Sequence, residues 1–154
     1  MKEYVIIAPH ADDEIIGCYE LLKKGLSKHV FFGSEKAREE AVISSELFGF
    51  SIHLFDEMPT SSSWIYVFPD PTYELHPDHR SYGSFGEDIL RKYGYEVLFY
   101  STNMNAPYIH EIPQPELKRR DLERCYSKKN SLWLYDHKYF LFEGYTKWIM
   151  EFDI

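Results

Sequence analysis

The fold of this chain is decided in residues 4–18, YVIIAPHADDEIIGC, where the periodicity changes. Tyr4–Ala8 is a continuous apolar and β-branched run, typical of a strand buried on both faces of a parallel sheet. From Asp13 onward apolar residues recur at helical spacing. The junction holds one histidine and three acids: His10, Asp12, Asp13 and Glu14. A strand that ends in solvent needs only one or two polar residues. This cluster has more, which indicates a site with a chemical function.

The same alternation continues and predicts an α/β fold. We expect a first helix over 13–26 that ends at Gly25, with Glu20, Lys23 and Lys24 facing solvent. Further along we expect a strand at 29–32, a helix from an N-cap at Ser34 to 48, and a strand at 51–55. The order β-α-β-α-β predicts parallel strands with right-handed crossovers.

The second half of the chain is less regular. Residues 57–80 are rich in serine, proline and aromatic residues, which indicates a loop with one short strand at 65–68. After it we expect a helix at 81–93, strands at 95–101 and 106–112, a helix at 115–127 with Leu117, Leu122, Cys125 and Tyr126 inward, and a strand within 139–150. The prediction is a single domain over 1–154 with a Rossmann-like three-layer fold, a mostly parallel sheet and an active site at the carboxyl ends of the strands.

The composition narrows the classes of partner. The chain has 154 residues, 44% of them hydrophobic, and a net charge of −8. Its densest basic stretch is only 118–120, so we expect neither a nucleic-acid partner nor an anionic membrane. No apolar run reaches the length of a membrane span or resembles a signal peptide. Cys18 and Cys125 are expected to be reduced core thiols of a cytoplasmic protein, and the sequence leaves open whether it forms a homo-oligomer.

Two clusters of histidines and acids suggest a metal site. His10 and Asp13 are three residues apart across a tight turn, so both can reach one ion. The helix N-terminus favours the ionised forms of Asp12 and Asp13. Taken alone, either acid could simply cap the helix.

The second cluster is ELHPDHR, residues 74–80, with His76, Asp78 and His79 at the end of the expected loop. Pro77 restricts the backbone between the two histidines. Residues from both clusters would make a two-histidine, one-carboxylate site with room for water, which is the pattern of a catalytic zinc site. The remaining histidines lack such acidic neighbours, and we interpret them as structural or surface residues: His29, His53, His110 and His137.

At these motifs the sequence resembles the PIG-L/LmbE family of zinc-dependent N-acetylglucosamine deacetylases. VIIAPHADDEIIGC is similar to the family's strand, PHPDDE motif and GC-containing helix, with Ala11 at the family's proline. HPDHR matches the second motif unaltered. REEAVISSELFG, LKRRDLERCYSKK and FEGY resemble three further segments, so the resemblance covers most of the chain. The loop GSEKAREE, residues 33–40, is shorter than in most relatives.

The resemblance implies a role for each matching residue. Zn²⁺ would be bound by His10, Asp13 and His79. Asp12 would be the general base, and His76 would help to stabilise the tetrahedral intermediate. Beside them, the resemblance implies that Asp78 orients a histidine and that Arg38 and Tyr73 contact substrate.

The resemblance thus implies a hydrolase that removes acetyl from a small N-acetylamino sugar of the N-acetylglucosamine type. Three alternatives stay open: hydrolysis of a different small amide, sugar binding without turnover, and Fe²⁺ or another divalent metal in place of Zn²⁺. His10, Asp12 and a distant histidine also imitate the facial triad of non-haem iron oxygenases. We favour the hydrolase because the iron site would leave one aspartate and His76 without a role.

Overall fold

The computed structural model describes residues 2–102, 106–126 and 142–145. Its strands are β1 (Glu3–Ala8), β2 (Ser27–Phe32), β3 (Ser51–Leu54), β4 (Trp64–Pro69), β5 (Val97–Ser101), β6 (Tyr108–Glu111) and β7 (Phe142–Tyr145). Its helices are α1 (Asp13–Lys23), α2 (Glu35–Glu40), α3 (Val42–Phe48), α4 (Pro77–Tyr93) and α5 (Pro115–Tyr126), with a 3₁₀ turn at Phe55–Glu57.

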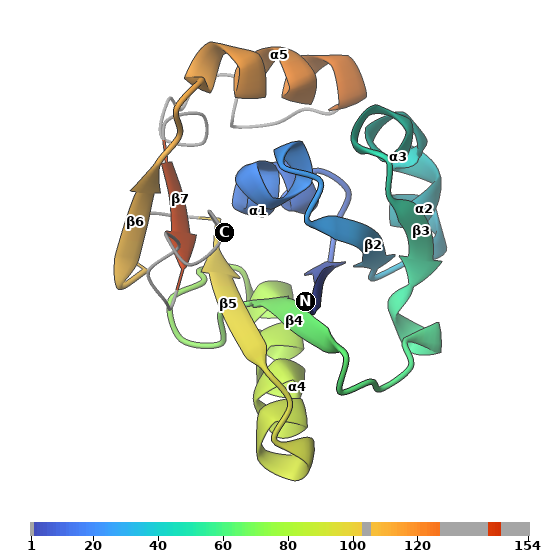
Figure 1. Ribbon diagram of the computed structural model, residues 1–154, viewed down its shortest axis with the longest axis vertical. Coiled ribbons are helices and arrows are strands. Elements are labelled where there is room, and N and C mark those ends of the chain that lie inside the picture. The colour runs from blue at the N-terminus through green and yellow to red at the C-terminus, as the bar shows by residue number, and fades with distance from the viewer. Residues whose placement is uncertain (1, 103–105, 127–141, 146–154) are drawn as a thin grey trace.

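The strands form one mostly parallel sheet in the order β3-β2-β1-β4-β5-β7-β6 (Figure 1). The first five strands are mutually parallel, and β7 pairs antiparallel with both β5 and β6. The predicted α/β class with a mostly parallel sheet is confirmed. The direction of winding reverses between β1 and β4, which is where open α/β sheets commonly bind ligands.

Strand β1 lies at the centre of two apolar clusters. Val5, Ile6, Ile7 and Ala8 are all fully buried. Because side chains alternate along a strand, Ile6 and Ala8 join the cluster that contains α1 and α5 side chains. Val5 and Ile7 join a second cluster that contains Ile89 of α4. The continuous apolar run therefore reflects burial on both faces, as the sequence predicts.

Helix α1 lies between the sheet and α5 (Figure 1) and is shorter than predicted. It ends at Lys23, because Gly25 adopts a left-handed backbone with φ of 68°. Lys23 and Lys24 are exposed as expected. Glu20 is not: only 8% of it is exposed, so the prediction that it faces solvent is wrong. Its place inside follows from the position of α5 and β7, which the periodicity of α1 does not reveal.

The predicted helix over 34–48 is two helices that meet at Ala41. The Ala41 N–H donates to the carbonyl of Arg38, three residues back, so the chain tightens there and α2 ends. Both predicted ends are confirmed. The hydroxyl of Ser34 accepts from the Ala37 N–H at 3.1 Å, and Gly49 closes α3 with φ of 74°.

Helix α4 begins at Pro77, four residues before the predicted start, so the second histidine motif is its first turn and not a loop. Proline suits this position because the first helical N–H has no partner within the helix. His76 is the N-cap, and its Nδ1 accepts from the Asp78 N–H at 3.1 Å. The sequence rules missed this start because a histidine is an uncommon cap.

Other boundaries differ by a few residues. The third strand ends at Leu54 and continues into the 3₁₀ turn, while β5 and β6 are shorter than the predicted 95–101 and 106–112. The strand predicted within 139–150 is β7 over its described part, and its other residues lie outside the described ones. His137 and Ser127 also lie outside them. Both cysteines are buried and free, as predicted.

Helix α1 is kinked at Cys18, whose φ of −135° and ψ of 30° are not helical. The Glu20 N–H donates to Glu143 Oε1 of β7 at 3.2 Å. The carbonyl of Ile16 accepts from Lys118 Nζ of α5 at 2.8 Å. In an unbroken helix that N–H and that carbonyl would bond to each other. Two side chains from the C-terminal part of the chain therefore replace a helical hydrogen bond.

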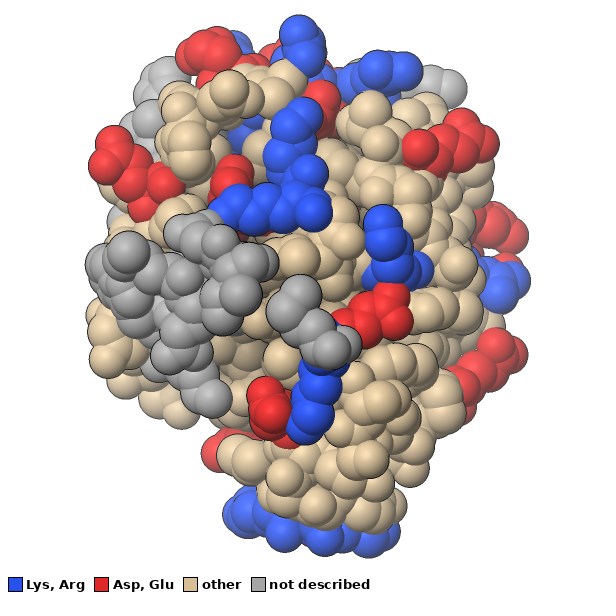
Figure 2. Space-filling view, in the orientation of Figure 1, with Lys and Arg blue, Asp and Glu red and all other residues tan. Residues whose placement is uncertain are grey.

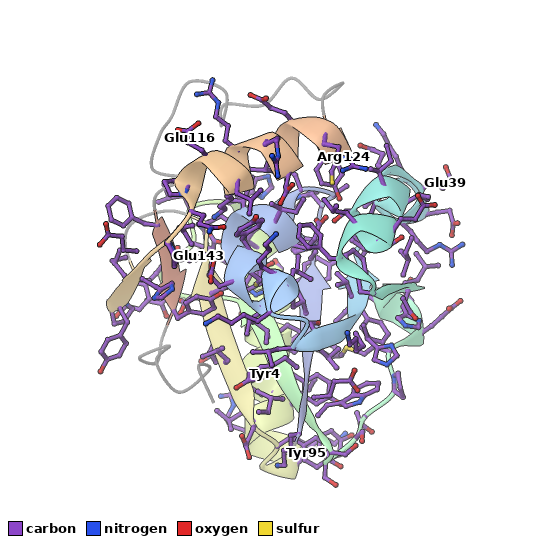
Figure 3. The ribbon with its side chains drawn as sticks, turned by 45° about the horizontal axis from the view of Figure 1, so that its top comes forward. Tyr4, Glu39, Tyr95, Glu116, Arg124 and Glu143 are labelled. Carbon is purple, nitrogen blue, oxygen red and sulfur yellow. The ribbon has the colours of Figure 1, made fainter. Side chains whose placement is uncertain are left out.

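The same buried cluster continues along β7. Tyr145 OH lies 3.0 Å from the carbonyl of Gly17 and 3.0 Å from Glu143 Oε2. Glu143 lies beside α1 (Figure 3), and burial raises its pKa to about 7 against the nearby charge of Lys118. Burial likewise lowers the pKa of Lys118, whose Nζ is 3.5 Å from Glu143 Oε1. These polar groups tie α5 and β7 to α1.

Basic side chains gather over α5 and at the lower end of α4 in Figure 2, and basic and acidic side chains are mixed between the two groups. Lys118 is fully buried, so the basic stretch 118–120 offers less surface charge than its sequence suggests. No helix among the described residues has the length and apolar character to cross a membrane.

We expect Lys118→Met to lower the free energy of unfolding by about 3–5 kcal/mol, because it leaves Glu143 and the Ile16 carbonyl buried without their cation. Lys23→Met is the control, since Lys23 is exposed at the end of α1, and we expect its effect to stay within about 0.5 kcal/mol. Urea unfolding measures both. Equal stability of the two variants would show that the buried lysine does not hold α1.

Candidate metal centre

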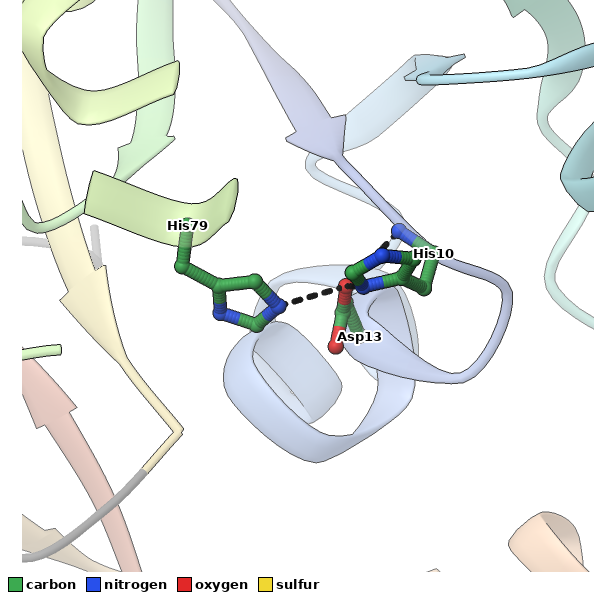
Figure 4. Close-up of side chains that lie close together, drawn as sticks. All are labelled: His10, Asp13 and His79. Carbon is green, nitrogen blue, oxygen red and sulfur yellow. Dashed lines mark hydrogen bonds and ion pairs between the residues drawn. The ribbon is translucent and has the colours of Figure 1, made fainter. Parts of the chain in front are cut away.

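Three predicted ligands meet between β1 and α4 (Figure 4). Asp13 Oδ2 lies 3.4 Å from His10 Nδ1 and 3.1 Å from His79 Nε2. One ligand atom from each of the three residues lies within 4.8 Å of the other two. Asp13 and His79 are buried, whereas 43% of the His10 side chain is exposed. The site is therefore fixed on its inner side and open on its outer side.

Local structure brings His10 and Asp13 together. His10 follows the end of β1, and Asp13 is the first residue of α1. The His10 N–H donates to Asp13 Oδ2 at 2.8 Å, and the Asp13 N–H donates to the His10 carbonyl at 3.3 Å. These two bonds close a tight turn between strand and helix. His79 reaches the turn because β4, which precedes α4, is the parallel neighbour of β1.

Glu74 orients His79 and was assigned no role by the sequence analysis. Its Oε1 lies 3.0 Å from His79 Nδ1, and it also accepts from the N–H and the hydroxyl of Thr102. A proton on Nδ1 leaves Nε2 with a lone pair for a metal, and metal-binding histidines usually have such a carboxylate partner. Glu74 is 2% exposed. The available signal was an acid at the start of ELHPDHR, the same segment as the ligand.

The electrostatics of the cluster favour a cation. Burial alone would raise the pKa of Asp13, but hydrogen bonds from His10 and His79 outweigh it and hold that pKa far below its usual range. Burial opposes a charge on His79, yet the carboxylates of Asp13 and Glu74 raise its pKa to about 10. The hydrogen bond with Asp13 also raises the pKa of His10. The two carboxylates therefore attract positive charge, here carried by protons.

The donor set fits a divalent metal. Two imidazole nitrogens and one carboxylate oxygen are ligands that Zn²⁺ accepts, and three protein ligands leave a fourth position for water. The same set also suits Fe²⁺, so the donors alone do not choose between these metals.

Asp78 and His76 lie on the open side of the cluster. Asp78 Oδ2 is 3.3 Å from His10 Nε2, where it can orient that ring. The His76 ring centroid is 5.1 Å from that of His10 and 5.2 Å from that of His79. His10, His76 and Asp78 are also close enough to hold a cation. A neutral imidazole has only one lone pair, so His10 cannot serve both groups together.

Asp12 occupies the N-cap position of α1 without capping it through its side chain. Its φ of 99° is the only positive value at a non-glycine residue among those described. Such a left-handed backbone costs about 1–3 kcal/mol and is concentrated at functional sites. The alternative that Asp12 is a simple helix cap is therefore not supported.

An open pocket of about 490 Å³ adjoins His10. It is lined by His10, Ala11, Ser34, Lys36, Ala37, Glu39 and Glu40. Most of these come from α2 and its N-cap Ser34, so the segment 33–40, which the resemblance treats as a shortened loop, is mostly helix. The lining of the pocket therefore includes one basic side chain, Lys36, and two acidic ones, Glu39 and Glu40.

The two predicted substrate residues are placed apart from this pocket's lining. Arg38 lies on α2 and pairs with Glu35, and it is not among the residues that line the pocket. Tyr73 is 37% exposed in the loop before α4, and its N–H donates to Asp70 Oδ1 at 2.7 Å. Their contact with substrate stays a prediction.

The described histidines outside the cluster fit the structural interpretation. His29 Nδ1 lies 3.0 Å from His53 Nε2, across the paired strands β2 and β3. His110 lies on β6.

A comparison with protein-family models found no match, and a comparison with curated proteins found no similar sequence. The resemblance to the PIG-L/LmbE family therefore rests on the motifs, and the roles carried over from it are proposals.

We expect Glu74→Ala to weaken Zn²⁺ binding about 10- to 100-fold, because His79 loses the carboxylate that fixes its ring. Glu46→Ala is the control, since Glu46 is exposed on α3, and its affinity should equal that of the wild type. Competition with a chelating dye measures both. Unchanged affinity in Glu74→Ala would show that the contact does not orient the ligand.

We expect Zn²⁺ affinity to rise with pH by up to about tenfold per unit between pH 6 and 8 for each proton released. The reason is that His79, with its pKa of about 10, must lose its proton to bind metal. In metal-free protein the raised pKa of His79 also contributes to the free energy of unfolding. This contribution is complete below the unfolded pKa of 6.5 and is lost as the pH rises through 10. Calorimetry in buffers of different ionisation enthalpy counts the protons. Binding without proton release would contradict the shift.

Proposed function

We propose that this protein is a Zn²⁺-dependent hydrolase of the PIG-L/LmbE type that removes acetyl from a small N-acetylamino sugar. The observation that carries the proposal is the convergence of His10, Asp13 and His79, from two motifs far apart in the sequence, beside a strained Asp12. A structural ion pair would need neither a second aspartate nor a half-exposed ligand. We place the active site at the carboxyl ends of β1 and β4, within a three-layer arrangement.

In this proposal His10, Asp13 and His79 hold the metal. Bound Zn²⁺ would supply a water of lowered pKa and polarise the amide carbonyl. Asp12 takes the proton from the attacking water and gives it to the leaving amine, so one carboxylate serves as base and then as acid. His76, whose Nδ1 accepts from the Asp78 N–H, lies on the open side and stabilises the negative charge on the carbonyl oxygen by donating a hydrogen bond from its Nε2.

The proposed substrate is small because the pocket beside His10 has a volume of about 490 Å³ and a lining with charged side chains. Lys36, Glu39 and Glu40 can form hydrogen bonds with hydroxyl groups of a sugar. The aromatic residues of β4 do not stack on substrate in this proposal. Tyr66 and Phe68 are fully buried in the cluster beneath α4, together with Trp64 at its border, so they pack the fold.

The motif's metal chemistry also suits related reactions. A different small amide would use the same residues, and a sugar-binding protein without turnover would keep the pocket. An oxygenase with Fe²⁺ would have to use His10, Asp13 and His79 in place of the triad with Asp12 that the sequence suggests, because Asp12 is not among the residues grouped there. Asp12 and His76 would then have no role. We place the protein in the cytoplasm because both cysteines are free and buried.

We expect Zn²⁺-loaded wild-type protein to release amine from N-acetylglucosamine derivatives, and Asp12→Asn to lower kcat by at least about 100-fold, since general base catalysis contributes about 10²–10⁴-fold. Both proteins should bind one equivalent of Zn²⁺, because Asp12 is not a ligand. Amine release under nitrogen separates this reaction from an oxygenase.

Full activity of Asp12→Asn would show that Asp12 is not the general base. No release by either protein, with Zn²⁺ bound, would reject the acetylated sugar as substrate and favour the other amides. Activity only with Fe²⁺ and oxygen would reject the hydrolase.

A further inference from the structure

The backbone of Asp12 has a left-handed φ of 99°, which is disfavoured for a residue with a side chain. Its side chain makes no capping hydrogen bond to α1. A contact that holds its backbone N–H therefore supports the turn between β1 and α1 in this shape.

Glu14 supplies that support from the first turn of α1. The Asp12 N–H donates to Glu14 Oε1 at 3.0 Å. Glu14 is the second residue of α1, so its carboxylate reaches back from the first turn to the N–H of the N-cap residue. The side chain of Glu14 is completely buried, so its position depends on what surrounds it.

Tyr126 holds the other oxygen of the same carboxylate. Its hydroxyl, at the last residue of α5, donates to Glu14 Oε2. Tyr126 is 3% exposed, and burial beside Glu14 raises its pKa far above the usual range, so it remains a donor. Both oxygens of Glu14 are thus fixed, one by α5 and one by the backbone of Asp12.

We propose that Tyr126 and Glu14 are positioning residues that hold the backbone of Asp12, and with it the general base, in the geometry that the reaction needs. The inference rests on the proposed function, because Asp12 is a base only in that function. Neither residue contacts the three metal ligands through these bonds. The chain of contacts predicts an effect on kcat that is separate from metal binding.

The test compares Tyr126→Phe with Tyr19→Phe. Tyr19 also joins α1 to α5, through a 2.7 Å hydrogen bond from its hydroxyl to Asp121 Oδ2, and it is buried. The two variants therefore lose the same atom between the same two helices. Only Tyr126 is linked to Asp12.

We expect Tyr126→Phe to lower kcat about fivefold or more, the factor that one lost hydrogen bond corresponds to. KM and Zn²⁺ affinity should match those of Tyr19→Phe, whose kcat should equal that of the wild type. Equal kcat in the two variants would overturn the proposal, because it would show that Tyr126 has only a structural role.

Amide hydrogen exchange at Asp12, followed by NMR on the ¹⁵N-labelled protein, tests the contact without any substrate. We expect exchange of this N–H to be about fivefold faster or more in Tyr126→Phe than in Tyr19→Phe. Equal exchange rates would overturn the proposal even if no substrate were found. No amine release by the Zn²⁺-loaded wild type would instead reject the proposed function, so the two failures are distinguishable.

Discussion

The arrangement of the site depends on one oxygen atom, Oδ2 of Asp13. It accepts the N–H of His10 at 2.8 Å and lies within 3.4 Å of a ring nitrogen of both His10 and His79. These contacts join the end of β1, the start of α1 and the first turn of α4. Because Asp13 is buried, the carboxylate is shielded from water and its attraction for positive charge is strong. A positive charge at this point interacts favourably with all three residues. Without it, burying these polar groups together would raise the free energy of the folded state.

Polar groups buried around α1 hold the helix whose first residue is Asp13. Lys118 and Glu143 replace a hydrogen bond that α1 lacks at its kink, Tyr145 donates to the Gly17 carbonyl, and Tyr126 holds Glu14. Buried polar groups are costly unless paired, so a network of this kind permits few alternative positions for the helix. The C-terminal part of the chain thereby holds α1, the helix that carries Asp13, whereas all three ligands lie within residues 10–79.

Sequence reasoning succeeded where a local pattern had a single physical solution. The apolar run of β1, the cap at Ser34 and the left-handed turn at Gly49 were all predicted from residue type and spacing. It failed at Glu20, because amphipathic periodicity assumes one solvent-facing side and α1 has none over that turn. It also missed Glu74, whose partners are residues of α4 and the end of β5.

The sequence by itself determined the α/β class, the strand and the helix on either side of the first histidine motif, and the residue types that a divalent metal would need. These follow from periodicity and from the chemistry of side chains, which are local properties. Only the tertiary structure decided that His79 meets Asp13, that Glu74 orients it, and that Asp78 lies at His10. The reason is that β1 and β4 become neighbours through long-range pairing in the sheet, and a contact between distant segments leaves no periodic trace in either of them.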